Sequence, residues 1–461
     1  MHFHKFQNEI HHDAVQLNYG ISLIMPLQKS DKLAKTFLST AMVCLLAGLI
    51  FGLAGGIQYV VPLWMKDSFP FTRLRPLHVS LVITWIFTAA SGGIYYYLPR
   101  IVKRPLYSVR LGWLHYSLLL LSVLAISAGY FSGIFGGREY LEFPPVLGLL
   151  ILSYWIVFLI NYFSTVRKYE GKWPVYLWMW SVGLIFFAFT FLESQLWIIP
   201  FFRDNIVRDT TIQWKALGSM VGSWNMMVYG TAFFLMEKIS GKTSVVFARK
   251  TFFFFFLGLT NLMFNWGHHT YIVPASTWIR DVSYIISMTE LLILGNIIYH
   301  WRSTVSEINR YGNINSFRFL SAADIWIFLN LILAILISVP AINLHTHGTH
   351  FTVAHAMGTT IGINTMILMA SLIFIRENYP RHENTIKVSA GFWICNISLL
   401  IFWLSLLVAG FIKSIYQGQL SHQDILSRQI PWFFTIAISG FLFLIGMILI
   451  IKSVVKVRSK E

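Results

Sequence analysis

Apolar stretches of about twenty or more residues recur along the whole of this 461-residue chain, and they constrain its fold more than any other feature. The chain is 56% hydrophobic and only 12% charged, and a soluble domain could not keep so much apolar surface away from water. The sequence therefore predicts a single all-α, polytopic membrane bundle that is embedded in a lipid bilayer.

We predict twelve membrane-spanning helices. Their boundaries fall at about residues 33–62, 73–99, 109–135, 144–168, 173–200, 212–238, 246–275, 278–303, 319–343, 350–376, 387–416 and 428–455. The transmembrane domain then occupies residues 33–461. Residues 1–32 are polar and lack a cleavable signal pattern, so we expect a cytoplasmic or interfacial N-terminal segment. A metal site built from the histidines of that segment is the alternative.

The formal net charge of +16 at first suggests a nucleic-acid partner, but the positions of the basic residues argue against one. The larger share of Lys and Arg lies at the termini and in the loops after the even-numbered spans, for example at Arg100, Lys103, Arg104, Arg167 and Lys168. By the positive-inside rule, this pattern places both termini in the cytoplasm. We therefore predict a multi-pass protein of the bacterial inner membrane that binds no nucleic acid.

Four histidines are expected to meet at one membrane depth. His78 opens the second span, His268 and His269 end the seventh, and His355 opens the tenth. Because these spans alternate in direction, all four imidazoles lie towards the outer face. An isolated intramembrane histidine is usually a hydrogen-bonded core residue, but several together suggest a functional site. Neutral imidazole binds iron, copper and zinc, so the pattern indicates haem and a second metal.

Met357 follows His355 by two residues, which places the two side chains about 200° apart around a helix. One helix could therefore ligate two cofactors, with His355 facing the His268 and His269 metal and Met357 facing His78. Imidazole and thioether are both axial ligands of haem iron. The alternative for Met357 is ordinary core packing.

Five short motifs carry a resemblance to a known family. They are Gly-Ile-Gln-Tyr-Val at 56–60, Arg-Pro-Leu-His-Val at 75–79, Gly-Arg-Glu-Tyr-Leu-Glu at 137–142, Gly-His-His at 267–269, and Thr-His-Gly-Thr at 346–349 followed by Ala354-His355. With these motifs, nearly the whole chain resembles the catalytic large subunit of cytochrome c-dependent nitric oxide reductase, in the haem-copper oxidase superfamily.

The resemblance implies two haems b and a non-haem metal. His78 would be an axial ligand of a low-spin haem b, with Met357 opposite it. His355 would be the proximal ligand of a high-spin haem b. His268 and His269 would be two of the three histidines on a non-haem iron that faces this haem.

The resemblance also implies roles for residues around these ligands. Glu139 corresponds to a calcium-binding glutamate and Glu142 to a carboxylate where protons enter. Glu290 corresponds to an acidic residue behind the active site, and His347 would support the haem propionates. In the alternative interpretation, Arg138 and the acidic residues near it form a structural salt-bridge cluster.

Two positions depart from the family pattern. The sixth span has neither His nor Glu between residues 213 and 230, where the third metal ligand is expected, and Asn225 is its most obvious polar side chain. Two histidines with Asn225, water or Glu290 could hold iron, whereas copper would bind less well. An empty second-metal site is equally conceivable. The other departure is Met357, since His/Met ligation raises the haem potential relative to two imidazoles.

The function implied is respiratory-chain reduction of nitric oxide, a small diatomic gas, to nitrous oxide. The chain has only Cys44 and Cys395 and no C-x-x-C-H motif, so we expect a separate, membrane-anchored cytochrome c subunit to supply electrons. The alternatives are an oxygen-reducing terminal oxidase of the cytochrome c oxidase subunit I type, a protein like the nitric oxide dismutases, and a non-catalytic haem-binding membrane protein.

Two further ionisable residues lie within apolar segments. Glu193, near the end of the fifth span, is either functional or a partner of Arg203 or Arg208. His115 is expected to be a packing or interfacial residue.

Overall fold

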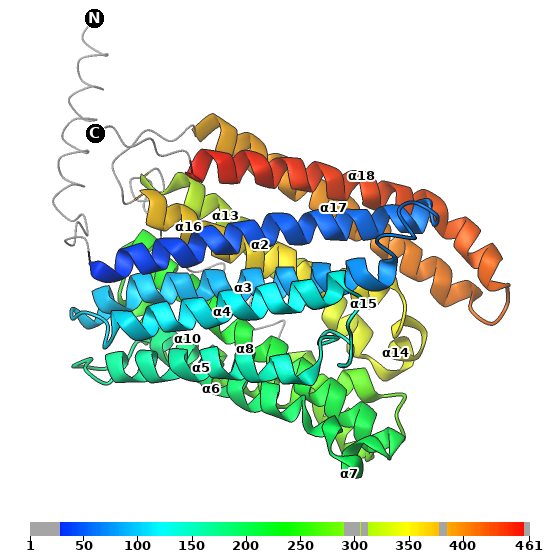
Figure 1. Cartoon of the computed structure of the whole chain (residues 1–461), viewed down its shortest axis with the longest axis horizontal. Coiled ribbons are helices and arrows are strands. Elements are labelled where there is room, and N and C mark those ends of the chain that lie inside the picture. Colours follow the sequence, from blue (N-terminus) through cyan, green and yellow to red (C-terminus); the bar gives the residue numbers. More distant parts are fainter. Residues whose placement is uncertain (1–27, 290–304, 306–311, 378–384, 456–461) are drawn as a thin grey trace, which may run out of the picture.

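The computed structural model describes residues 28–289, 305, 312–377 and 385–455, and these residues form a bundle of long helices that run side by side (Figure 1). The first half contains α2 (Lys29–Val60), α3 (Phe71–Val102), α4 (Val109–Phe131), α5 (Pro145–Val166), α6 (Val175–Glu193), η1 (Leu196–Ile198), α7 (Pro200–Arg203) and α8 (Ile206–Ser240). The second half contains α9 (Ser244–Phe247), α10 (Arg249–Phe264), η2 (Asn265–Thr270), α13 (Ile314–Ser338), α14 (Pro340–Thr346), α15 (His350–Met357), η3 (Gly358–Thr365), α16 (Met366–Glu377), α17 (Thr385–Tyr416) and α18 (His422–Val455).

The predicted all-α membrane architecture is confirmed. Within the described ranges there is no β-strand, and nine helices are long and apolar enough to cross a membrane. Eleven of the twelve predicted spans coincide with described helices, with ends shifted by a few residues. The eighth is helical from 277 to 289, and the rest of it lies outside the described residues. Residues 1–27 also lie outside them, so the role of the N-terminal segment stays a prediction.

Local sequence signals explain where several helices begin and end. The Asn205 side chain accepts hydrogen bonds from the backbone N–H groups of Val207 and Arg208 and so caps α8. At the other end of α8, Gly241 adopts the left-handed conformation (φ 69°) that glycine adopts without strain. A proline occupies the first turn of α5, where its missing N–H costs no helical hydrogen bond.

The tenth span is not one continuous α-helix, although its apolar pattern predicted one. Between α15 and α16 the eight residues of η3 adopt a π-helix, in which the Thr365 hydroxyl donates to the Thr360 carbonyl. Two glycines of this segment lie against α13. A Cβ at Gly358 would fall 2.3 Å from an Asn330 oxygen, and one at Gly362 would fall 2.6 Å from Trp326. The wider turn therefore accompanies an unusually close contact between two helices.

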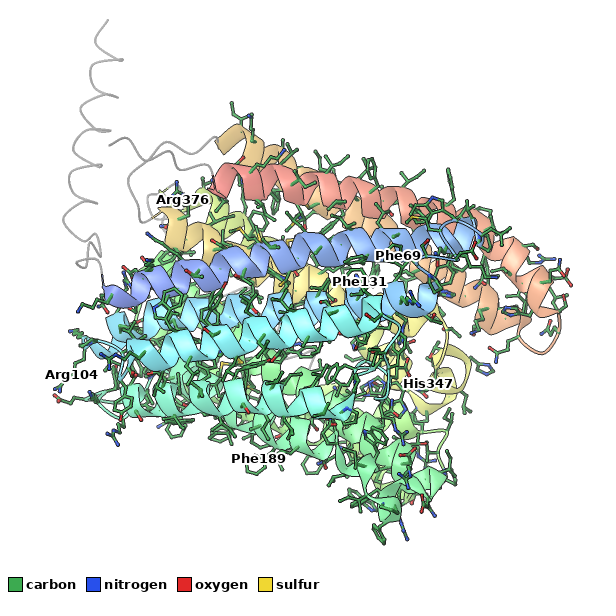
Figure 2. The ribbon with its side chains drawn as sticks, in the orientation of Figure 1. Phe69, Arg104, Phe131, Phe189, His347 and Arg376 are labelled. Carbon is green, nitrogen blue, oxygen red and sulfur yellow. The ribbon has the colours of Figure 1, made fainter. Side chains whose placement is uncertain are left out.

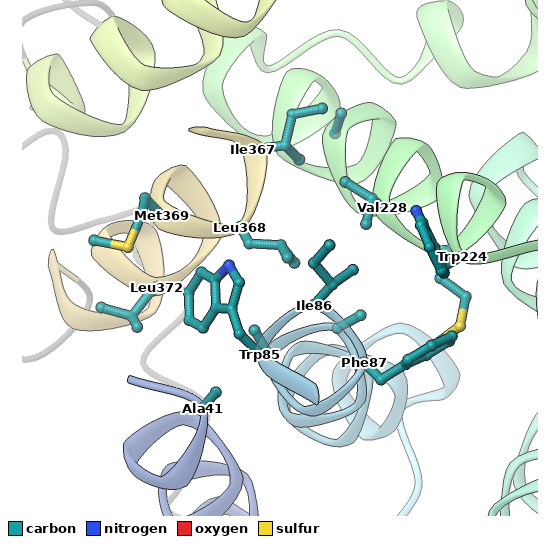
Figure 3. Packing of buried hydrophobic residues seen from close by; sticks show 14 of the residues in the cluster. Ala41, Trp85, Ile86, Phe87, Trp224, Val228, Ile367, Leu368, Met369 and Leu372 are labelled. Atoms are coloured by element: carbon teal, nitrogen blue, oxygen red, sulfur yellow. The ribbon is translucent and has the colours of Figure 1, made fainter. Parts of the chain in front are cut away.

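Helix α3 lies at the centre of the packed interior. Figure 3 shows Trp85 and Ile86 of α3 beside Leu368 of α16, with Trp224 of α8 on the other side of the same helix. The Trp85 indole N–H donates to the Thr365 hydroxyl at 3.1 Å, so its polar atom is satisfied inside an apolar core. Residues on α3 are therefore held from several directions.

The two ends of the bundle differ in chemistry. One end, which we call the basic end, carries Arg100, Lys103, Arg104, Arg167, Lys168, Lys242, Arg249, Lys250 and Arg376. The other, which we call the histidine end, carries His78, His268, His269, His347, His350 and His355. Figure 2 shows Arg104 and Arg376 at the first end and His347 at the second.

A buried ion pair joins the first two long helices at the basic end. The Arg100 guanidinium donates to both Asp31 carboxylate oxygens at 2.8 Å, and these side chains are only 10% and 3% exposed. The guanidinium also lies 3.7 Å from the centre of the Tyr96 ring. Asp31 in turn accepts the Gln28 backbone N–H at the start of α2. A bidentate pair of this kind fixes geometry as well as charge.

Replacing Asp31 with Asn should destabilise the protein by about 3–5 kcal/mol, because the buried Arg100 guanidinium would lose its bidentate pairing with a carboxylate. The free energy of unfolding can be measured by denaturant titration in detergent micelles. Glu170→Gln is the matched control, since its partner Arg104 is exposed and such surface pairs contribute about 0–1 kcal/mol. Equal effects of the two substitutions would contradict the role given to the buried pair.

Candidate functional site

A cavity of about 1440 Å³ opens within the bundle towards the histidine end. Residues of most long helices line it, from α2 to α6, α8, α10, α13 and α15 to α18, together with η2 and η3. Its walls include the candidate haem and metal residues of the described part of the chain, namely His78, His268, His269, His347, His355 and Met357. Most small-ligand pockets measure about 300–1,000 Å³, so this volume suits more than one large group. The four histidines that were predicted to lie at one membrane depth therefore line the same cavity, and their roles as ligands stay predictions.

His78 is fixed between α2 and α3. Its Nδ1 lies 2.7 Å from the Gly48 carbonyl oxygen, which can only accept, so Nδ1 carries the proton and Nε2 is left to act as a ligand. Gly52 lies directly beneath the ring, where a Cβ would fall 2.5 Å from Nδ1. The glycine is required because the helix backbone and the imidazole touch.

The start of the tenth span supplies two candidate ligands. The Thr349 side chain accepts the Phe351 backbone N–H and caps α15, which carries His355 and Met357. Val353 is 39% exposed although it lies inside the bundle, which shows that one face of α15 borders the cavity. His355 is one of the cavity-lining residues of α15, and its imidazole lies near the Asn330 backbone of α13. An imidazole at this place fits a group that enters the cavity.

His268 and His269 lie in the 3₁₀ turn η2, whereas their sequence context predicted an α-helix. Their ring centroids are 4.2 Å apart, with an angle of 41° between the planes. His268 Nδ1 donates to the Asn265 side-chain oxygen at 3.1 Å, and the Ser287 hydroxyl donates to the same oxygen at 2.6 Å. The hydrogen bonds of His268 and Ser287 to Asn265 orient the His268 ring and leave its Nε2 available to a metal.

Trp214 of α8 is a site residue that was not predicted from the sequence. Its indole stacks on His269, with centroids 5.0 Å apart and planes at 11°, and its edge contacts His347. The His269 and His347 centroids are 6.5 Å apart. No spacing pattern marks Trp214 in the sequence, since aromatic residues are frequent in every span.

The second-metal site has two histidines from η2 but no third ligand from α8. Across the described ranges, no group of three His, Cys, Asp or Glu side chains is placed to hold a metal ion. Where a third ligand was expected, α8 instead has glycines that pack against its neighbours. A Cβ at Gly218 would fall 2.6 Å from Trp266, and one at Gly222 would fall 2.9 Å from the backbone of Leu262.

Asn225 lines the cavity from α8, as expected for a polar residue at that depth. Its side-chain oxygen accepts a hydrogen bond from the Asn364 amide at 3.0 Å, which ties α8 to the π-helical segment η3. Asn364 Oδ1 is buried and has no partner in the described part of the chain. Asn225 is therefore engaged with another amide, and a role as metal ligand would require it to give up this bond.

The acidic loop between α4 and α5 is held by Arg75. Its guanidinium contacts Glu139 at 2.5 Å and Glu142 at 3.2 Å, while Arg138 pairs separately with Asp209. Burial raises the pKa of Glu142 above its ordinary value, although Arg75 acts in the opposite direction. The loop therefore contains ion pairs, but the expected pairing of Arg138 with its flanking acidic residues was wrong, since Arg75 holds Glu139 and Glu142. The calcium role of Glu139 stays a prediction.

The expected partner of Glu193 was wrong. Glu193 pairs with Lys215 of α8, whereas Arg203 pairs with the neighbouring Asp204 and Arg208 stacks on Phe201. The packing of α8 against α6 brings Lys215 close to Glu193 at the end of α6. The separation of the two residues in the sequence could not reveal this contact. Glu290 lies outside the described residues, so its placement behind the active site stays a prediction.

Comparison with known proteins finds a family pattern over most of the chain. Residues 32–442 match the family described as cytochrome c and quinol oxidase polypeptide I. The chain is 24% identical to a nitric oxide reductase subunit of Stutzerimonas stutzeri, over 91% of this chain and 93% of that protein. It is 21% identical to the cbb3-type cytochrome c oxidase subunit CcoN1 of the same organism, over 91% of this chain and 93% of that protein.

Among solved structures, a chain of a haem-copper terminal oxidase dimer has a similar fold. The TM-score is 0.77 at 15% sequence identity, over 95% of this chain and 86% of that chain. At this level of identity the likeness concerns the fold.

Replacing Gly52 with Ala should displace the His78 ring and break its bond to Gly48. If His78 holds a haem, occupancy of that haem should fall by roughly tenfold or more, as when other outer-shell partners of ligands are lost. Haem content can be measured from the visible absorbance of the purified protein. Gly55→Ala is the control, because its Cβ would meet atoms at an ordinary 3.6 Å. Unchanged haem content in Gly52→Ala would refute the assignment of His78.

Proposed function

Because the chain belongs to the cytochrome c and quinol oxidase polypeptide I family of haem-copper oxidases, we propose that this membrane oxidoreductase reduces nitric oxide. In the balanced reaction, two nitric oxide molecules, two electrons and two protons give nitrous oxide and water. The observation that carries the proposal is the convergence of His78, His355 and the His268–His269 pair on one buried cavity. A membrane-anchored cytochrome c subunit of the bacterial inner membrane would supply the electrons.

In this proposal each imidazole has one task. When bound, two haems b and a non-haem iron would bind the gas and transfer electrons to it. His78 and Met357 would hold the low-spin haem, and His355 the high-spin haem. His268 and His269 would hold the iron.

Residues around the ligands orient them and close the site. The Gly48 carbonyl fixes the tautomer of His78, and Asn265 fixes that of His268. Trp214 would hold the His269 ring in place by stacking on it. His347 lies beside the Trp214 and His269 rings, and in this proposal it would meet a haem propionate.

Protons are proposed to reach the site through the acidic loop at the histidine end. Glu142 Oε2 is buried and has no hydrogen-bond partner within the described chain, while Oε1 is held by Arg75. The raised pKa of Glu142 makes a protonated state accessible nearer to neutral pH than for an exposed carboxyl group. A carboxyl group of this kind can accept a proton and pass it on.

The donor set favours iron over copper at the second-metal site. Two imidazoles come from η2, and oxygen ligands from Asn225, Glu290 or water would complete the coordination. Iron accepts such mixed nitrogen and oxygen ligands, whereas copper in this site would require a further nitrogen ligand. The missing α8 histidine therefore also argues against an oxygen-reducing oxidase with a three-histidine copper site.

One observation favours a second candidate function. The described residues contain no cluster of three metal-binding side chains, so the chain could be a haem protein that binds a gas without a second metal. Metal analysis of the purified protein separates the two functions. Two haem irons and one further iron per chain, with nitrous oxide produced from nitric oxide, support the reductase. Two haem irons alone, without turnover of nitric oxide, would rule out the reductase and support the gas-binding haem protein.

Replacing His268 or His269 with Ala should remove the non-haem metal while both haems are retained, because these residues are the metal's two imidazole ligands. Iron per chain and nitrous oxide production should fall together, and the visible haem spectrum should change little. Asn261→Ala on the preceding helix is a control for a polar residue that also lines the cavity. Retention of the metal in both histidine variants would refute the proposed ligands.

Replacing Met357 with His should lower the midpoint potential of the low-spin haem, because two imidazoles stabilise the oxidised iron better than an imidazole and a thioether. A shift on the order of 0.1 V is expected within the range of about 0.8 V that axial ligands set. Spectroelectrochemical titration measures it. In Met357→Leu, the same haem should instead become high-spin. If both variants keep the original potential and spectrum, Met357 is not a ligand.

A further inference from the structure

A polar groove opens on the outside of the bundle at the basic end, between α2 and α4. It measures about 580 Å³, which is within the range of small-ligand pockets, and we call it the α2–α4 groove. Its lining residues carry amino, hydroxyl, amide or carboxylate groups, and they are distinct from the residues that line the main cavity. The groove is therefore separate from the candidate redox site.

One face of α2 supplies most of the groove. Lys32, Lys35 and Ser39 are spaced by three and four residues, so they follow one another along the same side of the helix, and all three are exposed. Asp31 also borders the groove, but its charge is balanced by the buried Arg100 at 2.8 Å. The face therefore presents two ammonium groups to the outside, with a hydroxyl group one turn further into the span.

Tyr116 of α4 forms the opposite side of the groove. Its hydroxyl lies 2.9 Å from the Thr40 hydroxyl of α2, and either group can be the donor. Because this bond uses only one of the two hydroxyl hydrogens, the other remains available to an oxygen atom in the groove. The Trp113 ring contacts the Tyr116 ring edge to face, with centroids 5.9 Å apart.

The groove lies at the depth where lipid headgroups are expected. Both α2 and α4 begin at the basic end, which the positive-inside rule assigns to the cytoplasm (Figure 1). Lys35 is within the first two turns of α2, and Trp113 and Tyr116 are within the first three turns of α4. Tryptophan and tyrosine are enriched at the headgroup level of membranes, and lysine side chains extend to the same level.

Further into the span, the same two helices present an apolar surface to the outside. On α2, Val43 and Ile50 follow Thr40 at helical spacings, and both are exposed. On α4, Leu121 and Leu124 are exposed. Ile50 lies about 15 Å further along the helix than Thr40. The charged groove therefore continues into an apolar surface on which an acyl chain can lie.

We propose that the α2–α4 groove binds the headgroup of an anionic phospholipid from the leaflet at the basic end. Lys32 and Lys35 pair with the phosphate, while the hydroxyl groups of Ser39, Thr40 and Tyr116 bind glycerol and ester oxygens. Basic pockets between membrane-spanning helices on the cytoplasmic side bind anionic headgroups in this way. A zwitterionic headgroup would add a cation beside the two lysines and is disfavoured. The inference is independent of the proposed function.

The test uses the full, haem-loaded protein in detergent, with phosphatidylglycerol as the probe. Native mass spectrometry at increasing lipid concentration counts the bound lipids and gives the affinity of the tightest one. We expect one phosphatidylglycerol to bind about tenfold or more tightly than phosphatidylcholine with the same acyl chains. In the double variant Lys32→Gln with Lys35→Gln, this preference should be lost while the visible haem spectrum stays unchanged. A preference that persists would overturn the proposal.

The double variant Lys168→Gln with Lys242→Gln is the matched control. Both lysines are exposed at the basic end and lie outside the groove, so the same charge is removed elsewhere on that end. Phosphatidylglycerol should bind this variant as tightly as the unmodified protein. An equal loss of affinity in the two double variants would mean that only the net charge of the basic end attracts the lipid, which would contradict a specific groove.

Ser39→Trp tests the shape of the groove, because it keeps both lysines and fills the space beside them. The affinity for phosphatidylglycerol should again fall by about tenfold, since the headgroup could no longer reach both lysines. Ser153→Trp, at an exposed serine of α5, should leave the affinity unchanged. Full affinity in Ser39→Trp would show that the lipid binds elsewhere.

Inorganic phosphate separates a lipid site from a site for a free anion. A large molar excess of phosphate should not displace phosphatidylglycerol, because the apolar surface below the groove also holds the acyl chains. Displacement by phosphate at the concentration of the lipid would identify a free-anion site and refute the proposal.

Thermal unfolding gives an independent measurement of the same binding. Phosphatidylglycerol should raise the melting temperature of the unmodified protein, because a ligand that binds only the folded state stabilises it. The variant without Lys32 and Lys35 should show no such rise, and an equal rise in both proteins would count against the groove. None of these measurements needs nitric oxide, so a chain that fails to reduce nitric oxide can still support the lipid site.

Discussion

The hydrogen bond from His78 Nδ1 to the Gly48 carbonyl is the interaction on which the site depends. It joins α2 to α3, selects one tautomer, and requires Gly52 beneath the ring. In an apolar bundle a polar side chain must find a partner, so the same bond that satisfies one imidazole nitrogen leaves the other for a ligand. His268 is arranged in the same way, with Asn265 in place of the carbonyl. In both residues one imidazole nitrogen is hydrogen-bonded within the protein, and the other is left available to a ligand.

Much of the fold and part of the site could be predicted from the sequence. The length of the apolar stretches predicted the helices, and their alternating directions predicted that His78, His268 and His355 meet. The 3₁₀ turn at His268 and the π-helix after Met357 were not predicted, because both depend on contacts with neighbouring helices. The Trp214 stack and the Glu193–Lys215 pair arise in the same way, from α8 lying beside η2 and α6.

Helix α8 shows how packing and chemistry compete for one surface. Gly218 and Gly222 allow α8 to touch Trp266 and Leu262 closely, and no imidazole projects from this face towards His268. Trp214 instead supplies an aromatic surface for His269. This arrangement offers no third imidazole and places an aromatic side chain beside His269, and under the proposed function it would suit iron more than copper. The chemistry of the site is therefore set as much by helix contact as by the ligands.

The π-helical segment η3 divides the tenth span into two halves that contact different parts of the structure. The residues before it must place His355 and Met357 on the cavity, whereas the residues after it must pack tightly on α3, where the Tyr97 hydroxyl meets Ser371. A regular helix would fix the rotation of one half relative to the other at 100° per residue. Each turn of the π-helix contains an extra residue, which changes this rotation, so the two halves of the span can face different neighbours. Substitutions that adjust the angle of the ligands can therefore accumulate over generations without disturbing the anchored half.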